Sequence, residues 1–227
     1  MTAMVPVYGN DKVKIDITYG AGFTLAIAPT AGINRHVYLL IGWYNAPGAI
    51  NYIRFDGSAM TLIANNNSYE CNIALYEGVI DDTSSGSKNI TTSWTTSRYY
   101  CAIAFTFAKG NAIGVNHATG ADIGSVAITS TLNTNDIDTM VMVTIGTNNA
   151  GTGTGIATPS DTLILSTSNN GDNGPHGSSG YRDADTPTTT MTATRSNTSV
   201  GTAYGWVSFV IGANSTPPIV INPILMF

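Results

Sequence analysis

Apolar residues alternate with small or polar residues in short runs along most of this 227-residue chain. In the segment YYCAIAFTFA the larger residues occupy every second position; they are Tyr99, Cys101, Ile103, Phe105 and Phe107. A period of two places alternate side chains on opposite faces of a β-strand, and no stretch repeats its apolar residues with a helical period. Because each apolar face must cover another sheet, the pattern predicts an all-β fold, an antiparallel two-sheet sandwich.

Segments of this kind recur throughout and are separated by turn-forming residues such as Asp56-Gly57, which favour a hairpin. The expected strands are 12–19, 23–28, 36–44, 50–56, 60–65, 70–79, 88–95, 99–108, 124–132, 139–145, 161–166, 188–195 and 203–211. They follow one another too closely for helices between them, which excludes folds built on parallel sheets. The Gly- and Asn-rich stretch 148–180 is interpreted as a pair of long surface loops around the short strand DTLILST.

The composition supports this fold and excludes several functions. Only 10% of residues are charged, with two glutamates and four lysines, so strong helix formers are scarce. The net charge is −5 and the basic residues are scattered, which argues against direct binding of nucleic acid. No apolar run is long enough to span a membrane as a helix, and the first residues do not resemble a signal peptide.

No catalytic pattern stands out, and we expect neither an enzyme nor a cofactor. His36, His117 and His176 have no spacing that pairs two of them as metal ligands, and nucleophile-elbow and P-loop motifs are missing from the sequence. Cys71 and Cys101 lie in apolar strand-like runs, which favours buried thiols, although a disulfide between strands stays open.

Closely spaced aspartates are the remaining candidates for chemistry. The pairs are Asp81 with Asp82, Asp136 with Asp138, and Asp183 with Asp185. They could bind Ca²⁺ or act on glycosidic bonds, but aspartates in Ser/Gly-rich segments are usually turn formers. The loop expected at 169–185 is the best calcium candidate, and no metal site is predicted from it.

Aromatic residues near strand ends suggest a glycan-binding surface. Trp43 and Tyr44 end one expected strand, and Tyr181 flanks the long loops. Such rings can stack on sugars, although packing in a core or against another subunit is the commoner role. The three residues are therefore candidate glycan-stacking positions.

The chain ends divide the sequence into a central domain and two extensions. We expect an N-terminal extension with one or two strands at 1–34, a β-sandwich domain at 35–213 and an apolar tail at 214–227. An apolar, uncharged tail must be buried to stay soluble, so it is a candidate subunit interface. Its apolar residues are Ile219, Ile221, Ile224, Leu225, Met226 and Phe227. Addition of the tail as a strand within its own chain is the alternative.

The order of hairpins from Arg35 to Ala213 resembles that of β-sandwich proteins of phages, archaeal viruses and environmental bacteria, of the virion-associated or decoration type. The matching segments are 53–55 with Gly57, 59–62, 72–76, Gly86 with 89–92, 102–107 with Gly110, and the strands DTMVMVTIGT and GWVSFVIGA. DDTSSGS stands where the family usually has prolines, and both chain ends lie outside the pattern. The resemblance implies a jelly-roll-like sandwich and a place on a virion or cell surface.

Together these points lead to a functional expectation. The chain is expected to be a structural protein of the virion, such as a capsid decoration or cement protein or a fibre subunit, that acts through subunit interfaces. Its expected partners are other virion proteins of the capsid or tail and further copies of itself, without nucleic acid or membrane. A surface glycan-binding β-sandwich module is the alternative.

Overall fold

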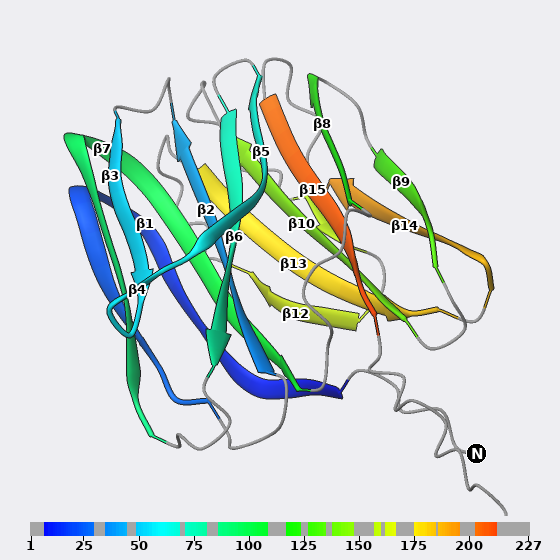
Figure 1. Cartoon of the computed structure of the whole chain (residues 1–227). Helices are drawn as coiled ribbons and strands as arrows, with labels where there is room; N and C mark the ends of the chain where they lie inside the picture. The colour runs from blue at the N-terminus through cyan, green and yellow to red at the C-terminus, as the bar shows by residue number, and fades with distance from the viewer. Residues whose placement is uncertain are drawn as a thin grey trace, which may run out of the picture.

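The computed structural model describes residues 7–29, 35–44, 49–68, 71–80, 86–108, 117–123, 127–134, 138–147, 157–159, 162–166, 175–184, 186–195 and 203–212. This part of the chain forms fifteen strands in three antiparallel sheets (Figure 1). It includes no helix of the length and apolarity that crossing a membrane requires. The predicted all-β antiparallel sandwich is confirmed, and the structure adds a third sheet to the two that were expected.

The first sheet has seven strands in the order β4-β3-β7-β2-β6-β5, with β1 paired to the other side of β7. Its strands are β1 (Val7–Ile27), β2 (Arg35–Tyr44), β3 (Ile50–Phe55), β4 (Ser58–Ala59), β5 (Thr61–Ser68), β6 (Cys71–Ile80) and β7 (Lys88–Ala108). The first half of β7 pairs with β3 and its second half with β2, while β1 follows β7 along its whole length.

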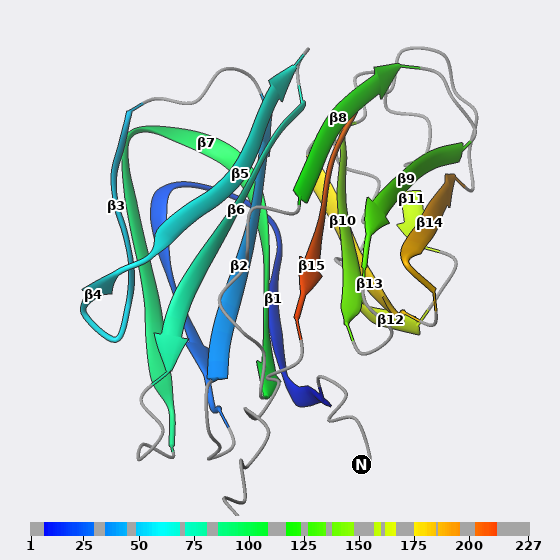
Figure 2. The same cartoon turned by 45° about the vertical axis from the view of Figure 1, so that its right-hand side comes forward.

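The first sheet folds back on itself, because β1 and β7 both bend in their middle (Figure 2). We call β5, β6, β2, the second half of β7 and the first half of β1 the inner layer. The outer layer consists of β4, β3, the first half of β7 and the second half of β1. Of the expected N-terminal extension, residues 7–27 form β1, which is an integral strand of this sheet.

Glycines and an aromatic cluster fix the bend. The pairing register shifts between Gly20 and Gly22, and Gly22 has a φ of 152°. A β-carbon at Gly22 would lie 2.2 Å from the Thr92 carbonyl oxygen, so only glycine fits there. The Trp94 indole donates a hydrogen bond to the Gly20 carbonyl (2.8 Å), and the Tyr100 hydroxyl donates one to the Gly22 carbonyl (3.2 Å).

The second and third sheets stack on the inner layer. The second sheet has the order β12-β13-β10-β15-β8, and the third has the order β11-β14-β9. Their strands are β8 (His117–Ile123), β9 (Ala127–Asn133), β10 (Thr139–Thr147), β11 (Ala157–Pro159), β12 (Thr162–Ser166), β13 (Pro175–Asp183), β14 (Thr188–Arg195) and β15 (Ala203–Ile211). Figure 2 shows the first sheet on the left and the other two on the right.

Three apolar cores separate these layers. The first core fills the space between the outer and inner layers and includes Ile53 and Leu39. The second core lies between the inner layer and the second sheet and includes Phe105 and Phe209. The third core, which includes Met142, lies between the second and third sheets. The inner layer and the second sheet are therefore buried on both faces.

The predicted alternation in β7 and the other central strands is confirmed. Cys101, Ile103, Phe105 and Phe107 enter the second core, whereas the alanines between them enter the first core. Cys101 is completely buried and is present as a thiol, not as half of a disulfide. β2 separates its strand from β6, which starts at Cys71, so the two α-carbons are about 9 Å apart or more, beyond the reach of a disulfide.

The interpretation of 148–180 as two long loops around one short strand was wrong for residues 175–180. Residues 175–183 form β13, which pairs with β10 on one side and β12 on the other. The strand has the sequence PHGSSGYRD and lacks the β-branched residues that signal a strand. Its small residues allow close packing, because a β-carbon at Gly177 would lie 2.7 Å from Ile145 Cδ1. β8 and β11 were also not predicted.

Candidate functional site

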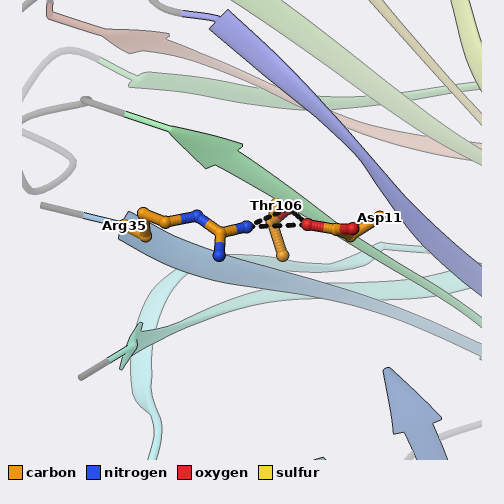
Figure 3. A network of polar contacts seen from close by, with 3 residues as sticks. All are labelled: Asp11, Arg35 and Thr106. Atoms are coloured by element: carbon orange, nitrogen blue, oxygen red, sulfur yellow. Dashed lines mark hydrogen bonds and ion pairs between the residues drawn. The ribbon is translucent and has the colours of Figure 1, made fainter. Parts of the chain in front are cut away.

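The most strongly buried charge in the described chain belongs to Arg35, the first residue of β2. Its side chain is 1% exposed and forms an ion pair with Asp11 of β1, with 2.7 Å between Nη2 and Oδ2. The Thr106 hydroxyl of β7 lies between them, 3.3 Å from the guanidinium and 3.0 Å from the carboxylate (Figure 3). The three residues thus connect three neighbouring strands of the inner layer.

This network neutralises a charge that would otherwise be costly to bury. The Thr106 hydroxyl donates a hydrogen bond to the Asp11 carboxylate and accepts one from Arg35 Nη2, so the hydroxyl is paired both as a donor and as an acceptor. Arg35 Nη1 has no hydrogen-bond partner in the described part of the chain. With Arg35 and Thr106 almost completely buried, the arrangement serves to hold β1, β2 and β7 in register.

A second polar group lies on the opposite face of the inner layer, in the second core. His36 Nδ1 is 2.9 Å from a Glu77 carboxylate oxygen, and both side chains are about nine-tenths buried. Tyr38 lies beside them, and its ring contacts Phe209 of the second sheet at 5.4 Å between centroids. Burial, and next the negative charge of Glu77, raise the pKa of Tyr38 well above its ordinary value. Its hydroxyl has no hydrogen-bond partner among the described residues.

Of the predicted acidic positions that the structure describes, Asp138 and Asp183 lie close together where β10 begins and β13 ends, because Thr139 pairs with Asp183 and the Ala184 amide donates a hydrogen bond to the Asp138 carbonyl (2.8 Å). Asp183 accepts a hydrogen bond from the Thr139 hydroxyl at 2.8 Å, and Asp138 is buried. His117 is exposed and His176 is buried. Asp81, Asp82, Asp136 and Asp185 lie outside the described residues. Within the described ranges no group of three or more His, Cys, Asp or Glu residues could hold a metal ion.

The three predicted glycan-stacking positions offer little open ring surface where they are described. Trp43 is 6% exposed and belongs to the first core. Tyr181 is half-buried and meets Phe107 edge-on, with 6.0 Å between ring centroids. Tyr44 is the last residue of β2, and its side chain lies outside the described part. The tail residues predicted as a subunit interface, from Ile219 to Phe227, also lie outside it.

The structure exposes a different pair of aromatic rings at the bend of the first sheet. Tyr19 is 63% exposed and Tyr99 is 49% exposed, and their ring centroids are 5.0 Å apart. The sequence pattern placed Tyr99 on the same face as Cys101, which was expected to be covered. That face is covered only from Cys101 onward, because the second sheet does not extend over the bend. The alternation of residues within one strand does not predict how far a second sheet extends over that strand.

Another aromatic residue is exposed on the outer layer. Tyr52 of β3 is 41% exposed, and the Arg54 guanidinium lies over its ring, 5.0 Å from the centroid. This cation–π contact covers part of the ring and fixes the arginine.

The outer face of the third sheet presents a regular array of threonines. Thr129 lies opposite Thr192, and Thr131 lies opposite Thr190. The two pairs of hydroxyls are 3.2 Å and 2.8 Å apart, within hydrogen-bonding distance. Threonine suits a strand exposed on one face, because its branched side chain favours β structure and its hydroxyl favours water.

No family model matches the chain, and no curated protein matches it either.

Proposed function

We propose that this chain is a structural protein of a virus particle, a capsid decoration or cement protein or a fibre subunit, that acts through subunit interfaces. The observation that carries the proposal is that the inner layer and the second sheet are buried on both faces. What remains accessible in the described chain is the outer faces and the strand edges, which are suited to contacts with other proteins.

The chemistry of these accessible surfaces supports lasting contacts. Only 10% of the residues are charged, and the outer face of the third sheet carries threonines such as Thr131 and Thr190. The cores of protein interfaces are depleted in charged residues and enriched in tyrosine. Tyr19, Tyr99 and Tyr52 are exposed on the first sheet. Burying such surfaces requires little desolvation of charge, so association is favoured.

The proposal is tested by quantitative mass spectrometry of purified virus particles from an infected culture. We expect the chain in the particles at a fixed ratio to the major capsid or tail protein, retained after density-gradient purification. An abundant intracellular chain that is missing from purified particles would overturn the proposal.

A surface glycan-binding module is the second candidate, favoured by the exposed pair Tyr19 and Tyr99. Sugar rings stack on exposed aromatic rings, and this pair stands clear of the second sheet. A glycan array with the full chain tests it. Binding that is lost in Tyr99→Ala and kept in Tyr52→Ala would support this function. Binding lost equally in both variants, or none in the wild type, would contradict it.

A further inference from the structure

The second half of β1 is an open edge of the first sheet. It pairs with β7 on one side, from Gly22 opposite Ser93 to Ile27 opposite Lys88. No strand of the described chain pairs with its other side. An open edge presents unpaired backbone N–H and C=O groups to any extended segment that can reach them.

The hydrogen bonds of β7 show which groups of this edge point outward. The Phe23 amide donates to the Thr92 hydroxyl, so the backbone of Phe23 points toward β7. Alternate residues of an antiparallel strand point to opposite sides. The backbone groups of Thr24 and Ala26 therefore point away from the sheet and offer two donors and two acceptors.

Nothing in this half of β1 protects the edge. Natural edges are usually blunted by charged residues, prolines or bulges. The first half of β1 has Lys12, Lys14 and two register shifts. In contrast, the segment FTLAI at 23–27 is uncharged, and its register with β7 is unbroken from Gly22 onward. Phe23 faces the first core and is only partly buried, whereas Leu25 and Ile27 on the same face are buried.

We propose that this edge, Gly22–Ile27, binds residues 219–222 of a second copy of the chain as an added β-strand. This rests on the proposed function, since it supplies the subunit contact. The segment Ile219-Val220-Ile221-Asn222 is uncharged and lies between Pro218 and Pro223. Prolines limit a strand to that length and are tolerated at sheet edges. Strand addition of this kind obtains affinity from the backbone and specificity from alternate side chains.

The pattern of the segment matches the edge on both faces. With Ile219 and Ile221 turned inward, two apolar side chains would lie on the face of Phe23 and Leu25 and would cover the exposed part of Phe23. Val220 and Asn222 would then lie beside Thr24 and Ala26 on the outer face, where exposed small residues already stand.

Distance favours a second copy over the chain's own tail. β15 ends at Ile211 in the second sheet, three strands from β12, which lies over β1 at the Lys12–Ile164 hydrogen bond. Three strand spacings and two sheet spacings correspond to a straight line of about 25 Å through the filled cores. The eight residue-to-residue steps from Gly212 to Val220 span at most about 29 Å when the chain is fully extended, and a path around the surface is longer than the straight line.

Cysteine cross-linking of the full chain tests the contact. Ala26→Cys protein is mixed with a size-tagged Val220→Cys or Asn222→Cys protein in a redox buffer, after circular dichroism shows that each is folded. We expect a covalent dimer of the two different copies as the main product on a non-reducing gel. Two matched controls are expected to stay monomeric: Ile221→Cys, on the opposite face of the added strand, and Asn89→Cys, next to Ala26 on β7.

Two results would overturn the proposal. One is a disulfide within single copies of an Ala26→Cys/Val220→Cys chain, which would mean that the tail binds its own edge. The other is cross-linking no greater than in the Asn89→Cys control. Neither result bears on the presence of the chain in purified particles, so failure of this contact and failure of the proposed function are distinguishable.

Discussion

Ile145 of β10 fits into the second core between two glycines, and this packing gives a sharp test of the fold. Gly177 is its direct partner on β13, and Gly42 faces it from β2 across the core. A β-carbon at Gly177 would lie 2.7 Å from Cδ1 of Ile145, and no other atom of Ile145 is among its three nearest neighbours. A β-carbon at Gly42 would lie 2.5, 2.6 and 2.7 Å from Cδ1, Cγ2 and Cγ1 of Ile145.

Ile145→Val removes Cδ1 and keeps both γ-carbons, so it should relieve one clash and leave the other. Gly177→Ala alone should cost about 1–3 kcal/mol of stability through overpacking. In the Ile145→Val background the nearest side-chain atom is Ile103 Cδ1 at 3.4 Å, which is ordinary contact. There Gly177→Ala should be neutral or stabilise by about 0.5–1 kcal/mol, because alanine loses less backbone entropy than glycine.

Gly42→Ala is the matched control, since the same isoleucine is involved. Both γ-carbons remain within 2.7 Å of its added carbon, so Ile145→Val should not rescue it. The expected coupling energy is therefore about 1–3 kcal/mol for the Gly177 pair and close to zero for the Gly42 pair.

The free energies of unfolding are measured by urea titration of the wild type, the three single variants and the two double variants, with tryptophan fluorescence as the signal. Linear extrapolation of each curve gives the two double-mutant cycles. Additive effects for Gly177 and Ile145 would refute the packing described for β13. A rescue of both glycine variants alike would refute the assigned orientation of Ile145.

Three further predictions concern buried polar groups. Asp11→Ala should cost about 3–5 kcal/mol in urea unfolding, because it leaves the Arg35 guanidinium buried without its counter-charge; a loss below 1 kcal/mol would contradict the network. Tyr38→Phe should stabilise the protein by up to about 1–3 kcal/mol at neutral pH, since it removes a buried hydroxyl without a partner. Because the pKa of Tyr38 is raised in the folded state, the unfolded chain loses the hydroxyl proton more readily. The part of the folding stability that depends on this proton is therefore intact below about pH 10 and is lost as the pH rises beyond that value. The alkaline loss of stability, followed by circular dichroism, should be smaller in Tyr38→Phe than in the wild type, and an unchanged alkaline midpoint would contradict this.

The sequence predicted the all-β fold class and which residues of the central strands lie on the same face. In β7 the alternation from Cys101 to Phe107 is governed by burial on both faces, so large and small residues separate cleanly. β14 and β15 begin and end at the predicted residues, because turn formers flank apolar or threonine-rich runs. These signals are local in the chain, which is why they could be read without a structure.

The layers depend on distant contacts and could not be predicted in the same way. β13 resembles a loop in sequence because its glycines and serines are selected by close approach to Ile145. β1 and β7 were each expected as two strands, since the bend at Gly20–Gly22 has the sequence of a turn. Two strands of the third sheet, β9 and β14, were predicted, but their separation into a third layer depends on packing against Met140 and Met142 of the second sheet, which the sequence of one strand does not predict.

Which side chains are accessible at the surface also depends on contacts between distant parts of the chain. Trp43 was a candidate glycan-stacking position because it lies near a strand end, but the folding back of the first sheet buries it, in line with the commoner core role. Tyr19 and Tyr99 are accessible because the second sheet stops short of the bend, which depends on the relative lengths of two sheets. The Arg35–Asp11 pair joins residues from separate strands, and no motif in the sequence marks it.

Size-exclusion chromatography with light scattering, applied to the full chain, tests most directly whether this protein acts by assembly. We predict a mass that is a multiple of 23.7 kDa for the wild type, and 23.7 kDa for a folded Ile219→Asp/Ile221→Asp variant. A wild type that remains at 23.7 kDa over the whole accessible concentration range would contradict the account.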